Sequence, residues 1–361
     1  MLAEVNLQNV CRIRRIIILK NCTRKSLINQ IIALLLSFMI IISISFPSYA
    51  INYDSRTKAI KTSVKKAQKI IADNPINTKH QDYSYKDLTN YSRLTPRQKK
   101  LHNSICKKVK QLKEVQYSCQ KYGDDLDKAV DALMYDEPLI NEFAEFYYYE
   151  EDGIDYLSVS YFEFQTDGRI KKVPVTTEKQ KEKLKKTISA YEKKVDRMAS
   201  LIVKGMPKNI STIDKYRYLA LCLCFITKYN NKALENPDSQ DKKTSKAACY
   251  DAPFVYGSAI CQGYALAYMY LCKKANLYCR FVTGKVDDNE TSGHAWNLVK
   301  INKGTYFVDV TWMDGNSPTS ADWFRYFMLT QSELQEDHKY IDDGVKATGR
   351  YSFRSRFAGI Y

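Results

Sequence analysis

A cysteine, a histidine and an aspartate in the last third of the chain are residue types that together carry out nucleophilic acyl transfer. Cys261 lies at the start of a helical pattern in SAICQGYALAYMYLC (Ser258–Cys272), whose apolar residues recur at spacings of three and four. A thiol attacks a carbonyl only as the thiolate, and its ordinary pKa of about 8.5 leaves little thiolate at neutral pH. Because a helix N-terminus and a neighbouring imidazolium both stabilise a thiolate, Cys261 has the position of a nucleophile.

His294 is the histidine best placed to act on that thiol. It begins the strand-like segment HAWNLVKIN in the same part of the chain as Cys261. Asp309 lies between two valines in the strand-like segment GTYFVDVTW, where folding alone does not account for an acid. A carboxylate at that position would hold the imidazole in the required tautomer. The other histidines lie in polar or charged segments of the chain: His80, His102 and His338.

A hairpin between these two segments would bring the histidine and the aspartate together. If its loop is centred between Asn302 and Lys303, His294 lies opposite Thr311. Asp309 is then a diagonal neighbour of His294 on the same face of the sheet. A loop longer or shorter by one residue moves Asp309 to the other face, so the triad requires an even-numbered loop.

Three short motifs in this order resemble the signature blocks of the transglutaminase-like superfamily: CQGYA at Cys261, GHAWN at Gly293 and DVTW at Asp309. Within it they most resemble bacterial exported proteins of the transglutaminase-core type. The resemblance implies a papain-like triad, with Cys261 as nucleophile, His294 as base and later acid, and Asp309 as the orienting group. It also implies an α+β fold, in which a helical and mixed N-terminal region precedes a core with the nucleophile helix packed on an antiparallel sheet.

Four further side chains near these motifs are candidates for binding substrate. The backbone N–H of Cys261 is one candidate donor to a developing oxyanion, and the side chain of Gln262 or of Tyr256 is a second. Trp296 and Trp312 follow the predicted base and acid closely. They suit the core or a sheet face, and we also consider them as walls of the site.

The function implied by this resemblance is an exported thiol enzyme that acts on protein or peptide amide bonds through an acyl-enzyme. Transfer of the acyl group to water makes it a cysteine peptidase, amidase or deamidase, and transfer to a lysine amine makes it a cross-linking transglutaminase. The motifs fit both outcomes. The alternative is a non-catalytic surface binding module on the same fold. No metal or other cofactor is expected, because the sequence contains no C-x-x-C pair and no EF-hand loop.

The N-terminus predicts export. A basic stretch precedes the apolar run IIALLLSFMIIISISF (residues 31–46), which is shorter than the roughly 20 residues of a membrane span. PSYA follows, with small residues where a signal peptidase requires them. We interpret residues 1–50 as a cleaved signal peptide in preference to a membrane anchor, which places the protein outside the cell or on its surface.

The remaining chain divides into three predicted regions. Residues 51–94 are polar and lysine-rich and predict a linker. Residues 95–235 combine helical patterns with an aromatic-rich β segment, which predicts a helical N-terminal domain with a small sheet. Residues 236–361 contain the three motifs and predict the catalytic core.

The net charge of +16 favours anionic surfaces as partners. No nucleic-acid-binding motif accompanies this charge, so a specific nucleic-acid partner is not predicted. We expect a protein or peptide substrate, including proteins of the cell wall or surface, and association with an anionic wall or membrane.

Overall fold

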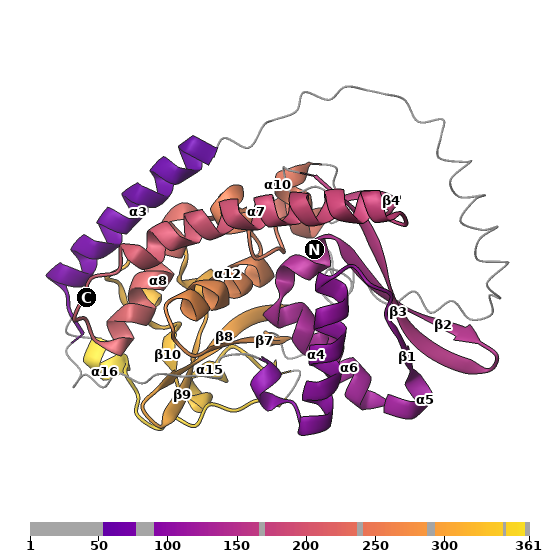
Figure 1. Cartoon of the computed structure of the whole chain (residues 1–361). Helices are drawn as coiled ribbons and strands as arrows, with labels where there is room; N and C mark the ends of the chain where they lie inside the picture. Colours follow the sequence, from indigo (N-terminus) through magenta and orange to yellow (C-terminus); the bar gives the residue numbers. More distant parts are fainter. Residues whose placement is uncertain are drawn as a thin grey trace. The chain divides into compact units, whose positions relative to one another are not determined.

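The structure is a computed structural model that describes residues 53–76, 90–165, 170–236, 241–286, 293–341 and 344–357 (Figure 1). The predicted export segment, residues 1–50, lies outside the described residues. Among the residues described, no helix has both the length and the apolar character needed to cross a membrane. The chain forms two compact units: one holds the described parts of Asn52–Arg93 and Glu192–Tyr361, and the other holds those of Leu94–Tyr191.

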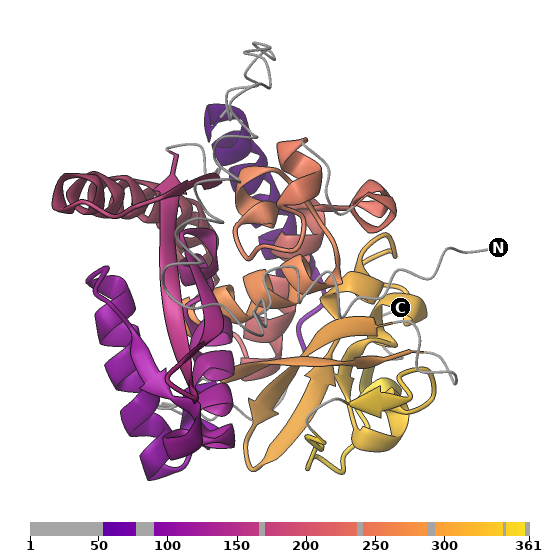
Figure 2. The ribbon, with the colours of Figure 1, turned by 90° about the vertical axis from the view of Figure 1, so that its right-hand side faces the viewer.

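The unit of residues 94–191 is built on an antiparallel sheet (Figure 2). β2 (Ala144–Glu151) and β3 (Ile154–Phe164) form a hairpin whose turn residues, Asp152 and Gly153, both have positive φ. The other edge of β3 pairs with β1 and β4. The remaining elements of this unit are β1 (Gln116–Ser118), β4 (Ile170–Pro174), α4 (Pro96–Lys110), α5 (Cys119–Tyr122), α6 (Asp124–Asp136), η2 (Pro138–Glu142) and the first part of α7 (Glu178–Lys204).

In the second unit a helix that begins at Cys261 packs on an antiparallel sheet, and this confirms the predicted α+β fold. The sheet has the strand order β10-β9-β8-β7-β11. Its strands are β7 (Cys279–Lys285), β8 (Gly293–Ile301), β9 (Gly304–Val308), β10 (Phe327–Leu329) and β11 (Tyr340–Ile341). α12 (Cys261–Lys274) lies against β7 and β8, and α8 (Thr212–Ile226) packs on α12 (Figure 1).

The boundary between the two units differs from the predicted boundary at residues 235/236. The unit that contains the sheet begins at Glu192, inside α7, and includes α8. α8 is apolar around most of its circumference, and eleven of its fifteen residues are buried. Such a helix requires neighbours on several sides, and α8 finds them in α3 (Tyr53–Asp73) and α12.

α3 corrects the prediction of a linker over residues 51–94. It is a 21-residue helix, and it buries Ile60, Ser63, Ala67 and Ile71 at spacings of three and four. Two of these four residues are small, so the hydrophobic period is weak in the sequence, yet small residues allow a helix to lie close to its neighbour. α3 packs against α8, as Figure 1 shows.

Short elements complete the unit. β5 (Lys228–Tyr229) pairs in parallel with β6 (Ser258–Ala259), directly before α12. The others are η1 (Asn90–Arg93), α9 (Asn231–Glu235), α10 (Lys242–Ser245), α11 (Ala252–Val255), α13 (Val310–Met313), α14 (Ala321–Phe324), α15 (Gln331–Leu334) and α16 (Arg354–Phe357). The eight cysteines from Cys106 to Cys279 are free thiols.

Candidate active site

Cys261 is the first residue of α12, as predicted, and only 1% of its surface is exposed. The residue before it, Ile260, makes no side-chain cap, so the N–H groups of the first turn are not capped from that position. The backbone N–H of Ile260 donates to the carbonyl of Ala247 over 2.9 Å. A Cβ on Gly263 would collide with that same carbonyl, which explains the glycine of the CQGYA motif.

The loop before α12 is held by Arg56, a residue of α3 that the sequence analysis did not single out. Its guanidinium donates to three backbone carbonyls: Phe254 at 3.0 Å, Ile226 at 2.9 Å, and Pro253. Gly257 has φ of +64°, and a Cβ there would meet the guanidinium. α3 therefore positions both the loop before α12 and the end of α8.

The β8–β9 hairpin has the predicted register. Ile301 pairs with Gly304 across a two-residue turn, and Asn302 takes positive φ in that turn. The pairing continues to Asn297 opposite Val308, where it ends. Asn297 is fully buried and donates from Nδ2 to the carbonyl of Ala265 over 2.9 Å, which ties β8 to α12.

The valine neighbours of Asp309 predict a position in mid-strand, and the structure shows that this prediction is wrong. β9 ends at Val308, and Asp309 is the N-cap of the short helix α13. Its Oδ1 accepts the backbone N–H groups of Thr311 at 3.0 Å and Trp312 at 3.3 Å. An aspartate ends a strand readily in this way, because its side chain replaces the backbone partners that the next N–H groups lack.

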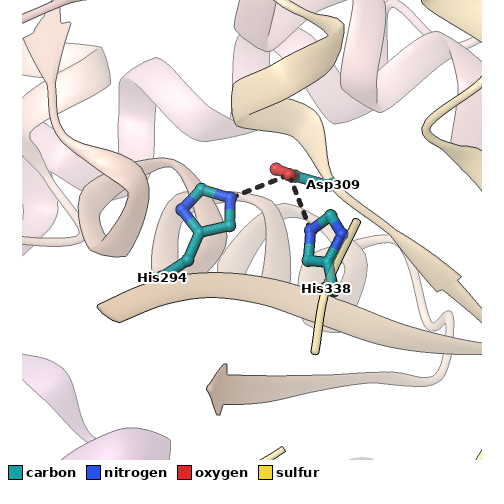
Figure 3. Close-up of side chains that lie close together, drawn as sticks. All are labelled: His294, Asp309 and His338. Atoms are coloured by element: carbon teal, nitrogen blue, oxygen red, sulfur yellow. Dashed lines mark hydrogen bonds and ion pairs between the residues drawn. The ribbon is translucent and has the colours of Figure 1, made fainter. Parts of the chain in front are cut away.

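The three predicted catalytic side chains meet. Nε2 of His294 lies 2.8 Å from Oδ2 of Asp309 (Figure 3). The imidazole is also hydrogen-bonded to the side chain of Cys261. Because Nε2 faces Asp309, Nδ1 is the nitrogen left for the thiol. His294 therefore bridges the thiol of Cys261 and the carboxylate of Asp309.

Charge and burial set the protonation of this pair. Burial alone would lower the pKa of His294, but the charge and hydrogen bond of Asp309, together with Cys261, outweigh it and raise that pKa. Burial alone would raise the pKa of Asp309, but His294 and then His338 lower it well below its usual range. Asp309 is therefore an ionised carboxylate that accepts hydrogen bonds and donates none.

His338 also lies in this cluster, although its neighbours in the sequence predict only a charged terminal segment. It is fully buried, and its Nε2 lies 3.3 Å from the same Oδ2 of Asp309 (Figure 3). Its Nδ1 lies 2.7 Å from Oδ1 of Asp337. The signal that could have found it is its spacing of four residues from Leu334, which is also fully buried.

Two tryptophans line the histidines. The ring of Trp312 stacks on that of His294 with centroids 5.0 Å apart, and Trp296 lies 5.8 Å from it. Trp312 and Trp296 also approach His338, at 4.5 Å and 4.8 Å. Trp296 is fully buried in a hydrophobic cluster, so it serves the core and borders the site at once. The tryptophan rings exclude water from this region, and this strengthens the charge interactions between Asp309 and the two histidines.

Comparison with known proteins agrees with the motifs. Residues 203–313 match the family described as the transglutaminase-like superfamily, and this range includes Cys261, His294 and Asp309. Residues 203–313 therefore form a domain of the transglutaminase-like superfamily. A search of curated proteins gives no significant match. The solved "Crystal structure of a TGase" is similar at 16% identity and a TM-score of 0.31, and the alignment covers 50% of this chain and 48% of the other, about half its length.

A tyrosine that was not predicted from the sequence contacts Cys261 in this transglutaminase-like core. The Tyr229 hydroxyl, on β5, is hydrogen-bonded to the backbone N–H of Cys261, and its ring stacks on Tyr264 at 6.4 Å. Burial, followed by the charge of Cys261, raises the pKa of Tyr229, so its phenol keeps its proton. Gln262 and Tyr256, the donors suggested by the sequence, are half-buried, and their role remains a prediction.

Three side chains of this site have the atom types that bind metal ions. His294, Asp309 and His338 bring such atoms within 4.8 Å of one another. In each histidine, however, Nε2 faces Oδ2 of Asp309 at hydrogen-bonding distance. A cation bound there would separate His294 from the carboxylate that orients it, so we assign these contacts to hydrogen bonding.

Proposed function

We propose that this protein is an exported thiol enzyme that cleaves or exchanges amide bonds of proteins or peptides through a Cys261 acyl-enzyme. One observation carries the proposal: His294 is hydrogen-bonded to Cys261 and lies 2.8 Å from the buried carboxylate of Asp309. A base held between a thiol and an orienting carboxylate is the arrangement that activates a nucleophile. Superfamily membership of the matched residues supports it.

The reaction proceeds in two halves. In the first, Cys261 loses its proton to His294, and the thiolate attacks a carboxamide or peptide carbonyl to form a carbon–sulfur bond. The carbon–nitrogen bond then breaks, and His294 returns the proton to the departing ammonia or amine. In the second, water or a primary amine attacks the thioester, His294 accepts its proton, and the proton returns to sulfur as the carbon–sulfur bond breaks.

The tetrahedral intermediate of each half carries an oxyanion that needs hydrogen-bond donors. The backbone N–H of Cys261 is the first donor, at the positive end of α12. The second is the Tyr229 hydroxyl, which in the free protein lies at that same N–H. A small shift of the phenol on substrate binding makes room for the oxygen and turns the O–H toward it.

The candidate activities differ in the acyl acceptor. Water yields a peptidase, amidase or deamidase, and a lysine amine yields a cross-link. The predicted signal peptide and the charge of +16 support a substrate among wall or surface proteins and contact with an anionic wall or membrane. We propose no cofactor for either activity.

The test is incubation of the protein with a glutamine-containing peptide, with and without a primary amine, followed by mass spectrometry. A deamidated product with water, an amine adduct, or new peptide termini each identify one activity. Cys261→Ala is expected to abolish all three. If wild type and Cys261→Ala give the same products, the proposed function is wrong.

Burial of the nucleophile favours the rival function, a non-catalytic binding module on the same fold. Cys261 is 1% exposed and His294 is 8% exposed, so an enzyme must open to admit substrate. Alkylation with iodoacetamide separates the two functions. An enzyme shows fast labelling of Cys261 that depends on His294, whereas a binding module shows uniformly slow thiols.

A further inference from the structure

The β2–β3 hairpin, in the unit of residues 94–191, has an acidic tip. Residues 144–164 contain six acidic residues and no lysine, arginine or histidine. Glu145 and Glu163, which lie away from the turn, pair with lysines of β4 and α7. The other four acids lie at or within two residues of the Asp152–Gly153 turn: Glu150, Glu151, Asp152 and Asp155. None of these four is paired with a basic side chain in the part of the chain that the structure describes.

Tyrosine rings line one face of this hairpin. Tyr149 and Tyr156 are cross-strand partners, and their rings stack with centroids 5.6 Å apart. Tyr147 follows on the same face, with its ring centroid 6.1 Å from that of Tyr149. The three tyrosines are half-buried, whereas Phe146 and Leu157 on the opposite face are buried. Tyrosine rings that stay partly open to solvent are enriched at protein-binding surfaces.

β2 is also an edge strand of its sheet, which has the order β1-β3-β2 (Figure 1). In antiparallel pairing, alternate residues direct their backbone groups toward the partner strand. The carbonyl of Phe143 accepts the N–H of Phe162, so odd-numbered residues of β2 bond to β3 and even-numbered residues direct their backbone groups outward. Natural edge strands are commonly protected by lysine, proline or a bulge. β2 contains no lysine or proline, and its register with β3 has no bulge.

The charge of β2 favours a basic partner over a second copy of the same strand. β2 has three acids and no basic residue, so two copies paired along this edge would bring like charges together. Side chains of an added strand alternate between the two faces of a sheet. On the tyrosine face a lysine or arginine meets Glu151 and aromatic rings, which attract cations. On the other face it meets Glu150.

We propose that the edge of β2 and the adjoining tyrosine face bind a lysine- or arginine-rich polypeptide segment in extended conformation, which adds to the sheet as a strand next to β2. Main-chain hydrogen bonds then supply affinity, and alternate side chains supply specificity. β2 has eight residues, so an eight-residue segment can pair along its whole length. Only a link to catalysis, in which such a segment supplies the acceptor amine, rests on the proposed function.

The first test is fluorescence anisotropy of labelled eight-residue peptides with the full chain carrying Cys261→Ala, in which acyl transfer to the peptide cannot imitate binding. An alternating Lys-Thr peptide is expected to bind at least about tenfold more tightly than an alternating Glu-Thr peptide, and its binding should weaken from about 50 to about 500 mM salt. Equal binding of the two peptides overturns the proposal. Tighter binding of chitohexaose, a neutral sugar, also overturns it, because the partner is then a glycan.

The second test locates the binding by charge reversal. Glu150→Lys combined with Glu151→Lys is expected to weaken binding of the Lys-Thr peptide at least about tenfold. Glu178→Lys combined with Glu182→Lys is the matched control, because it makes the same change in charge at exposed positions of α7. This control should change the affinity less than about twofold. Equal effects of the two double variants would show that net charge alone attracts the peptide, and would reject the site.

Glu150→Pro tests the addition of a strand. It removes an outward N–H of β2 and leaves the hydrogen bonds to β3 in place, because residue 150 is even-numbered. Glu150→Gln removes the same charge and keeps the N–H, and the proline variant is expected to bind at least about fivefold more weakly than the glutamine variant. Equal affinity of the two variants would contradict strand addition. These measurements use protein without the Cys261 thiol, so their failure is distinct from failure of the activity assay.

Discussion

Asp309 holds His294 with one carboxylate oxygen, at 2.8 Å, and caps α13 with the other. The orientation of His294 is thus tied to a helix terminus, because the carboxylate cannot rotate without losing backbone hydrogen bonds. The local fold and the orientation of His294 depend on the same side chain. The two roles can nevertheless be separated by substitution.

Asp309→Asn separates them. Asparagine is as good an N-cap as aspartate, so we expect the free energy of unfolding at neutral pH to change less than in Asp309→Ala, which loses the cap as well. The charge that fixes the tautomer of His294 is lost, and acyl transfer should fall about 1,000-fold or more. Initial rates and chemical denaturation measure the two effects. Activity within tenfold of wild type would show that Asp309 is not the orienting group.

The stability difference between wild type and Asp309→Asn is expected to depend on pH. The raised pKa of His294 contributes stability that is complete below the unfolded value of about 6.5 and is lost as pH rises through the folded value. The lowered pKa of Asp309 contributes stability above about 3.9, which is lost at lower pH. Wild type should therefore exceed Asp309→Asn in melting temperature most between about pH 5 and pH 6, and the gap should narrow toward pH 9. A gap that widens with pH would refute the raised pKa of His294.

Much of the site followed from the sequence because its determinants are local. The two-residue turn at Asn302–Lys303 sets the β8–β9 register, and the start of the helical period sets the place of Cys261. The valine neighbours of Asp309 predict a position in mid-strand, because valine favours strands, and no sequence period marks an aspartate that caps a helix. The predicted contact between Asp309 and His294 is nevertheless present, because Asp309 lies beside His294 in either conformation.

The residues that were missed depend on contacts distant in sequence. Arg56 reaches carbonyls about 170 to 200 positions away, and no local pattern marks it. Tyr229 lies on a two-residue strand beside the nucleophile loop. His338 stands among charged residues, which conceal the one face that is buried. Such contacts are set by tertiary packing rather than by propensity.

Tyr229→Phe tests the proposed oxyanion donor. It removes only the hydroxyl at the N–H of Cys261 and keeps the ring that stacks on Tyr264. We expect kcat for amide cleavage to fall about 100-fold with a small change in melting temperature. Tyr256→Phe is the matched control, because the sequence alone favours that tyrosine. A large loss in Tyr256→Phe and none in Tyr229→Phe would reverse the assignment.

Arg56→Ala tests whether α3 supports the nucleophile loop. Three carbonyls lose a charged donor, which should cost about 2–3 kcal/mol in the free energy of unfolding and reduce activity. Arg56→Lys, with a single compact ammonium, should recover part of the loss. Lys58→Ala removes an exposed charge from the same helix and should change the free energy by less than about 0.5 kcal/mol. Equal stability of Arg56→Ala and Lys58→Ala would exclude the supporting role.

Gly263→Ala is expected to lower the free energy of unfolding, whereas a glycine-to-alanine change inside a helix usually raises it. Inside a helix this change commonly stabilises by about 1 kcal/mol, because glycine loses more backbone entropy on folding. In α12 the new methyl group would lie against the carbonyl of Ala247, which also accepts the N–H of Ile260. The segment can escape this collision only by moving, and the N-terminus of α12 moves with it. We therefore expect unfolding to become easier by about 2 kcal/mol and labelling of Cys261 to lose its dependence on His294. A variant that is more stable and keeps this dependence would show that the glycine is not required for close packing.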